Sequence, residues 1–177
     1  MELSPTAYVI LGFLSWRPMS GYDIKARVEE STRFFWAASY GQIYPELKRL
    51  AAAGLIEPQG EAADGRRRTA YTLTADGRRA LEEWLAIEPE TWELRDDALL
   101  KLFFASAAPA TAAATLAEKH RMHAEALEEL RAMKASGGPS GYALIVLEHG
   151  IEMNEWMVDW CEGAIADLPD QTTGEDA

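Results

Sequence analysis

Apolar residues in the first third of the chain recur every three or four positions, which is the spacing of an amphipathic helix. Three such stretches span residues 4–16, 20–31 and 39–54. Each begins at a serine, a residue type whose hydroxyl accepts a hydrogen bond from an N–H group at a helix start. Gly54 closes the third stretch, as glycine commonly does at the end of a helix. The pattern therefore predicts three consecutive helices.

After Gly54 the helical spacing ends, and short runs of residues with a strand-like pattern follow. Residues 55–60 and 67–74 form two such runs around a turn-rich segment, and residues 74–86 return to helical spacing. Three helices, a hairpin and a fourth helix, in this order, are the layout of a winged helix-turn-helix domain. We place this domain at residues 1–87 and expect a mainly α fold with a small β-wing.

The second half of the chain is predicted to be helical. A linker-like stretch leads into three further helical patterns, over 94–105, 108–135 and 142–168. We interpret residues 88–168 as an α-helical dimerisation and effector domain. The polar segment that follows, 169–177, is predicted to be a disordered tail.

The helix predicted over 142–168 is apolar around more than half of its circumference. One seam, which we assign to dimerisation, consists of Leu144, Leu147, Ile151, Val158, Cys161 and Ile165. A second, more aromatic seam runs beside it. A helix of this kind packs on two sides. We expect one neighbour from its own chain and one from a second copy related by twofold symmetry. An intramolecular three-helix bundle is the alternative.

Tryptophan is frequent in this chain, with 6 residues in 177. Several lie in the second half, next to other side chains suited to a flat apolar ligand. The candidate effector-binding residues are Trp92, His149, Met153, Trp156 and Trp160. The alternative is that they pack in the core and at the dimer contact.

Charge is distributed unevenly along the chain. The net charge is −12, but residues 1–86 hold equal numbers of cationic and anionic side chains, so the whole excess lies in residues 87–177. Only the first part is therefore expected to approach a polyanion, through a local cluster of cations. A single cysteine, no signal-peptide pattern and no long apolar run favour a cytoplasmic protein.

The predicted hairpin tip and the third helix carry the candidate chemistry. Residues 66–68 are three arginines, which suit contact with phosphate or the minor groove unless they are only a solvated cluster. In the third helix Ile43, Leu47 and Leu50 account for the inner face. The other side chains include glutamine, which bonds adenine, and tyrosine and lysine, which bond phosphate. For Tyr44, packing in the core is the alternative.

The start of the second helix completes this candidate interface. Ser20, Gly21 and Tyr22 lie where free N–H groups favour a phosphate, although simple capping by Ser20 is the alternative. The residues predicted to contact DNA are Ser20, Tyr22, Ser39, Tyr40, Gln42, Tyr44, Lys48, Arg49, Arg66, Arg67 and Arg68.

Nothing in the sequence favours catalysis. His120 and His123 are three residues apart without a further metal-ligand motif, and Cys161 has no histidine or aspartate partner nearby in the sequence. The chain also has no glycine-rich phosphate loop followed by lysine. We therefore expect no catalytic residues, no metal and no cofactor.

Several of these motifs resemble those of PadR-like transcriptional regulators. The run GQIYPELKRL at 41–50, GLI at 54–56, YTLTADG at 71–77 and the opening segment with SGYDI are similar to the family's winged-helix domain. The second half resembles the helical region of its longer members, related to the virulence activator AphA. The resemblance covers nearly the whole chain.

The resemblance implies a homodimeric DNA-binding regulator, more often a repressor than an activator. Residues Tyr40, Gln42 and Tyr44 would then enter the major groove of a pseudo-palindromic operator, with the arginines of the wing on the backbone. Some family members release DNA on binding phenolic acids or hydrophobic drugs. Two other hypotheses are a winged-helix module for protein–protein interaction and a small-molecule-binding protein without operator-specific binding.

Overall fold

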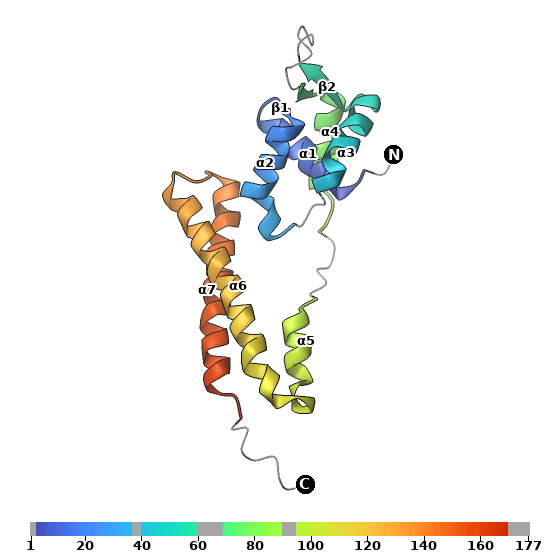
Figure 1. The fold of residues 1–177 in the computed structure, drawn as a ribbon. Helices are drawn as coiled ribbons and strands as arrows, with labels where there is room; N and C mark the ends of the chain where they lie inside the picture. The colour runs from blue at the N-terminus through green and yellow to red at the C-terminus, as the bar shows by residue number, and fades with distance from the viewer. Residues whose placement is uncertain (1–2, 37–39, 60–68, 90–94, 170–177) are drawn as a thin grey trace. The chain divides into compact units, whose positions relative to one another are not determined.

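The computed structural model describes residues 3–36, 40–59, 69–89 and 95–169, except for the side chain of Tyr40. The chain divides into two compact units, Met1–Thr91 and Trp92–Ala177 (Figure 1). Its architecture is mostly helical with one small sheet, which confirms the predicted fold class. None of the helices in the described segments is both long and apolar enough to cross a membrane.

Four α-helices build the first unit, and side-chain caps mark the starts of the first, second and fourth. The four helices are α1 (Pro5–Trp16), α2 (Gly21–Glu30), α3 (Ile43–Ala52) and α4 (Ala75–Leu85), with short 3-10 turns at Thr32–Phe34 and Tyr40–Gln42. The Ser4 hydroxyl accepts a hydrogen bond from the Ala7 N–H at 3.1 Å. At α4, the Thr74 hydroxyl accepts from the Gly77 N–H at 3.1 Å. These caps confirm the predicted helix starts at Ser4 and Thr74.

The sheet has one strand more than the sequence pattern predicts. Strands β2 (Ile56–Gln59) and β3 (Ala70–Leu73) form the predicted antiparallel hairpin, with Ile56 opposite Leu73. The two-residue strand β1 (Met19–Ser20) pairs with the other edge of β3, so the strand order is β1-β3-β2. Two residues are too few to show the alternation of a strand. The extra strand ties the start of α2 to the base of the wing.

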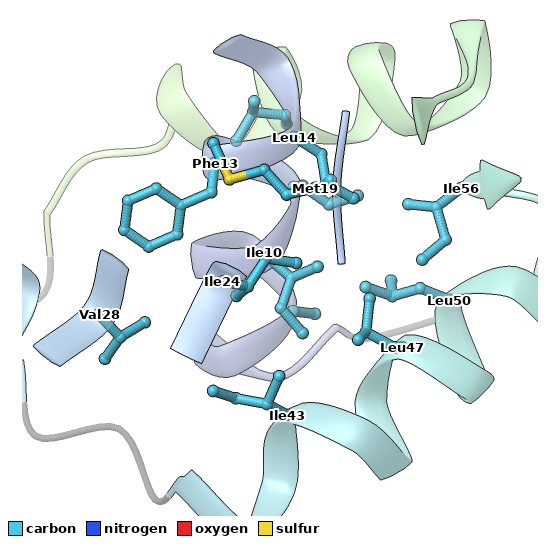
Figure 2. Packing of buried hydrophobic residues seen from close by; sticks show 13 residues of the cluster. Ile10, Phe13, Leu14, Met19, Ile24, Val28, Ile43, Leu47, Leu50 and Ile56 are labelled. Carbon is cyan, nitrogen blue, oxygen red and sulfur yellow. The ribbon is translucent and has the colours of Figure 1, made fainter. Parts of the chain in front are cut away.

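The core of the first unit lies between α1, α2, α3 and the sheet. Figure 2 shows Ile10, Ile24 and Leu50, from α1, α2 and α3, pointing toward one another, and all three are fully buried. Ile43 and Leu47 join them from α3 with 1% and 2% exposure, which confirms the inner face predicted for this helix. Burial of each such side chain stabilises the fold by about 1.5–3 kcal/mol.

The start of α3 differs from the prediction. We expected a continuous helix from Ser39, but a 3-10 turn covers Tyr40–Gln42 and the α-helix begins at Ile43. Ser39 lies outside the described residues. The later start places Pro45 third in the helix, among the positions whose N–H groups have no intrahelical partner in any case. Proline therefore removes no helical hydrogen bond here.

Gly77 lets α4 approach the segment that precedes β2. A Cβ atom at this position would lie 2.0 Å from the Leu55 carbonyl oxygen. Thr74 strengthens the same junction, because its hydroxyl donates to the Gly54 carbonyl at 2.8 Å. Gly54 itself has a φ of +72°, the left-handed conformation expected after the end of α3.

The second unit consists of helices α5 (Asp97–Phe103), α6 (Ala112–Ala135) and α7 (Tyr142–Ala166). Two 3-10 turns, Ala105–Ala107 and Pro109–Thr111, connect α5 to α6, so α6 begins slightly later than predicted. Helices α6 and α7 lie side by side along most of their length (Figure 1). Gly141, with a φ of +61°, precedes α7.

Part of the predicted dimerisation seam of α7 is buried inside a single chain. Leu147, Ile151 and Cys161 have exposures of 5%, 9% and 0%, and they are buried within the helical unit of a single chain. Leu144 and Val158 are partly buried, whereas Ile165 is exposed at 37%. The first three residues therefore pack within the chain. Helical periodicity identifies two apolar seams but does not say which neighbour each one meets.

Polar contacts join the three helices of the second unit. The carboxylate of Asp96, which caps α5 by accepting from the Leu99 N–H at 2.9 Å, also accepts a hydrogen bond from the buried Lys119 ammonium of α6. Between α6 and α7, His123 Nδ1 lies 2.7 Å from the Asn154 amide oxygen. These contacts fix the register of helices whose apolar faces alone would allow sliding.

Candidate nucleic-acid interface

A groove of about 420 Å³ runs along the outer side of α3 in the first unit. The start of α2, the middle of α3 and the base of the wing form its walls. Its lining consists of Ser20, Gly21, Tyr22, Tyr44, Leu47, Lys48, Thr69 and Tyr71. The groove therefore brings together four residues that the sequence predicts to contact DNA, namely Ser20, Tyr22, Tyr44 and Lys48.

Tyr44 lies on the surface of the groove rather than in the core. Its side chain is 53% exposed, and its ring rests against the backbone of Gly21 in α2. Leu47, one helical turn away, turns inward and is 2% exposed. The alternative considered from the sequence, that Tyr44 packs in the core, does not agree with this exposure.

Lys48 and Arg49 are neighbours in sequence with different surroundings. Lys48 is exposed and lines the groove. Arg49 is outside the groove lining, and its guanidinium donates to the Glu46 carboxylate at 2.8 Å. Glu46 also accepts from the Ser4 hydroxyl at 3.0 Å, which links α3 to the start of α1. The geometry favours Lys48 over Arg49 as the cation presented to a phosphate.

Ser20 has the capping role that the sequence left as an alternative. Its side chain accepts from the Asp23 N–H at 3.3 Å and donates to the Asp23 carboxylate at 2.7 Å. The same carboxylate accepts from the Ser20 N–H at 2.9 Å, which completes a capping box. Ser20 is only 4% exposed, so its contribution to the groove wall is to hold the start of α2 in place. Tyr22 beside it is 51% exposed.

Several predicted contacts fall elsewhere. Gln42 is exposed at the start of α3 but is not part of the groove lining. Ser39, the side chain of Tyr40 and the three arginines 66–68 lie outside the described residues. The groove lining also contains two residues that sequence reasoning missed, Thr69 and Tyr71. Both residues lie close to the arginines in the returning strand of the hairpin, and this position could have identified them from the sequence.

Comparison with known proteins identifies the class of regulator. The sequence model of the transcriptional regulator PadR-like family matches residues 10–83, and that of the virulence activator alpha C-terminal family matches residues 94–169. The negative transcriptional regulator PadR of Bacillus subtilis is 32% identical over an alignment that covers 90% of this chain and 94% of the relative. The chain belongs to the PadR-like family of transcriptional regulators.

Two solved structures of Bacillus subtilis PadR resemble this PadR-like chain. The complex of that protein with operator DNA superposes with a TM-score of 0.79 at 28% identity, covering 92% of this chain and 98% of the other. The complex with p-coumaric acid superposes with a TM-score of 0.74 at 29% identity, covering 96% of this chain and 99% of the other. Membership of this family makes the chain a transcriptional regulator rather than an enzyme, and the structural likeness confirms the predicted winged-helix fold.

The second unit of this PadR-like regulator holds most of the predicted effector residues on the exposed side of α7. Trp156 and Trp160 stack with ring centroids 6.5 Å apart, and Trp156 is 60% exposed. Met153 is 39% exposed, and His149 is also exposed. Trp92 lies outside the described residues. A separate hollow of about 460 Å³ is lined by Leu100, Lys101, Phe104, Ala105, Ala108, Thr111 and Thr115.

Catalytic or metal chemistry gains no support from the remaining polar groups. Burial raises the pKa of the Cys161 thiol, with a smaller opposing effect from Lys119. A thiol held protonated in this way is a poor nucleophile. Among the residues that the structure describes, no three histidine, cysteine, aspartate or glutamate side chains gather into a metal site.

Proposed function

We propose that this PadR-like regulator is a repressor that binds a pseudo-palindromic operator as a homodimer in the cytoplasm. The observation that carries the proposal is the groove beside α3, which presents Tyr44 and Lys48 next to the base of the wing. Bacillus subtilis PadR, of similar structure, has been solved in complex with operator DNA. A homodimer would place two such grooves on the two half-sites.

Each part of the interface has a distinct role in this proposal. Helix α3 enters the major groove, where Gln42 at its exposed start reads adenine through its amide group. The hydroxyls of Tyr22 and Tyr44 and the ammonium of Lys48 bind backbone phosphates. The arginines 66–68 of the wing add phosphate or minor-groove contacts. Phosphate neutralisation makes the affinity depend on salt.

The exposed side of α7 is the surface that we propose for dimerisation. Its large apolar side chains remain in contact with solvent in the single chain, and they are Tyr142, Ile145, Val146, Met153 and Trp156. A second copy related by twofold symmetry would cover these side chains with the same residues of its own α7. The proposed dimer contact does not include Leu147, Ile151 and Cys161, because these side chains are already buried within one chain.

Lys48→Ala is expected to weaken binding to the DNA upstream of the regulator's own gene by about three- to tenfold at moderate salt. The change removes one phosphate contact, so the slope of log affinity against log salt should fall by about 1. Electrophoretic mobility shift or fluorescence anisotropy at several salt concentrations measures both quantities. Random DNA should lose affinity to a similar extent, because a phosphate contact carries no sequence information.

Arg49→Ala is the matched control, because Arg49 is the next cation along α3 and is paired with Glu46. We expect it to leave the salt slope unchanged. A wild-type protein without a specific, salt-sensitive complex would reject operator binding and favour the protein–protein module instead. A reporter driven by the bound DNA should be expressed more strongly without the regulator, whereas weaker expression would indicate an activator.

We further propose that an aromatic or hydrophobic effector reduces operator affinity by binding near Trp156 and Trp160. The aromatic pair Trp156 and Trp160 beside the proposed dimer contact and the complex of Bacillus subtilis PadR with p-coumaric acid support this proposal. Such an effector would act by favouring a dimer geometry in which the two α3 helices no longer match the half-sites.

Titration with p-coumaric acid is expected to quench tryptophan fluorescence and to weaken operator binding over the same concentration range. In Trp156→Phe, which retains an apolar ring, the quenching should be smaller. Quenching without any effect on operator binding would reject coupling between the two sites. Unchanged fluorescence at millimolar ligand would reject p-coumaric acid as the effector.

A further inference from the structure

Gly21 lies at a point of very close approach between α2 and α3. A Cβ atom on Gly21 would be 2.7 Å from Cε1 and 3.1 Å from Cδ1 of the Tyr44 ring. It would also be 3.0 Å from Cδ1 of Leu47. Non-bonded carbon atoms prefer separations of about 3.5–4.0 Å. The ring of Tyr44 therefore occupies the space that any side chain at residue 21 would fill.

The backbone of Gly21 has little freedom to move out of the way. It is the first residue of α2, directly after Ser20, and the capping box between Ser20 and Asp23 closes around it. Ser20 is also paired with Ala70 in the sheet, and Ile24 is fully buried in the core below. By contrast, Tyr44 is half exposed and lines the open groove. A collision would therefore displace the tyrosine ring rather than α2.

We propose that Gly21 is a positioning residue for operator recognition, because its lack of a side chain lets the Tyr44 ring lie in the groove at the angle used for DNA. This inference rests on the proposed function. Gly21 acts through Tyr44 and has no required contact with DNA of its own. The short connection between β1 and α2 thereby sets the shape of the recognition surface on α3.

Gly21→Ala is the variant that tests the proposal, with Gly12→Ala as its matched control. A Cβ atom on Gly12, in α1, meets no atom within 4 Å, so the same chemical change there meets no obstacle. We expect Gly21→Ala to weaken operator binding about tenfold, with a melting temperature close to that of the wild type. Gly12→Ala should retain wild-type affinity.

Combining Gly21→Ala with Tyr44→Ala separates positioning from a general structural effect. Tyr44→Ala alone should weaken operator binding, and adding Gly21→Ala should cause no further loss, because the ring that it displaces is gone. Equal fold losses from Gly21→Ala in both backgrounds would overturn the proposal. Wild-type affinity in Gly21→Ala would also overturn it. So would a large fall in melting temperature, because the contact would then stabilise the fold rather than position the ring.

A measurement without DNA distinguishes this inference from the proposed function. The ring signals of Tyr44, assigned in NMR spectra by their loss in Tyr44→Phe, should shift in Gly21→Ala and stay in place in Gly12→Ala. Shifted signals in a protein that binds no operator would uphold the steric contact and reject the proposed function. Unshifted signals would reject the inference even if operator binding is confirmed.

Discussion

Trp156→Glu is expected to convert the proposed dimer into a monomer and to weaken operator binding by roughly a hundredfold or more. Trp156 is 60% exposed on α7 and stacks on Trp160, at the centre of the apolar face that remains uncovered in a single chain. Twofold symmetry would place two new carboxylates in the interface, where desolvation without a partner is strongly unfavourable. Loss of the dimer then removes the advantage of binding two half-sites together.

Sedimentation or light scattering measures the oligomeric state, and anisotropy with a full operator and a half-site measures the binding. Trp156→Phe should remain dimeric, because it keeps an apolar ring at the position. Ala132→Glu adds the same charge at an exposed position of α6 and should also remain dimeric. A dimer with wild-type operator affinity in Trp156→Glu would show that this face of α7 does not hold the two copies together.

Local chemistry explains why most helices could be predicted from the sequence. A capping serine or threonine acts on N–H groups two or three residues away, so Ser4, Ser20 and Thr74 define helix starts without help from the rest of the fold. Gly54 marks the end of α3 for an equally local reason, since its φ of +72° suits glycine. A cap whose donor and acceptor lie within one helical turn can be predicted from the sequence alone.

Features that depend on distant parts of the chain were harder to predict. Strand β1 exists because Met19 and Ser20 pair with β3, about fifty residues later in the sequence. The sequence also does not say which face of α7 meets α6, because both faces are apolar, and only the position of α6 shows that Leu147 is buried within the chain. The spacing of apolar residues identifies the faces of a helix, but the tertiary fold decides which element packs against each face.

In the candidate interface, too, features set by local sequence could be predicted and features set by distant contacts could not. The outward face of α3 followed from its buried residues, and the groove indeed contains Tyr44 and Lys48. The sequence could not distinguish Lys48 from Arg49, because the decisive contact is the link from Glu46 to Ser4 in a different helix. It also could not show that Gly21 provides the space for a ring on α3.

Asp96→Asn is expected to destabilise the helical unit by about 3 kcal/mol, because it leaves the Lys119 ammonium buried without its counter-charge. The Lys119 and Asp96 side chains are 7% and 16% exposed. Asparagine caps a helix about as well as aspartate, so the start of α5 should be preserved. Calorimetry should show the melting temperature of this unit lowered by roughly 12–24 °C.

The pH dependence of unfolding identifies the charge as the cause. Burial alone would raise the pKa of Asp96, but the hydrogen bond from Lys119, the Leu99 N–H and the lysine charge together lower it. A carboxyl with a lowered folded-state pKa stabilises the protein above its unfolded-state value of about 3.9, and this stabilisation is lost as the pH falls through the folded-state value. The stability difference between wild type and Asp96→Asn should therefore shrink in acid.

A double variant and a neighbouring variant complete the test. Adding Lys119→Met to Asp96→Asn removes the buried charge while retaining an apolar chain, so most of the lost stability should return. Asp97→Asn changes the next residue, whose ion pair with Lys101 is mostly exposed, and should have little effect. Equal destabilisation by Asp96→Asn and Asp97→Asn would contradict a special role for the buried pair. A double variant no more stable than Asp96→Asn would show that the loss comes from the cap of α5 instead.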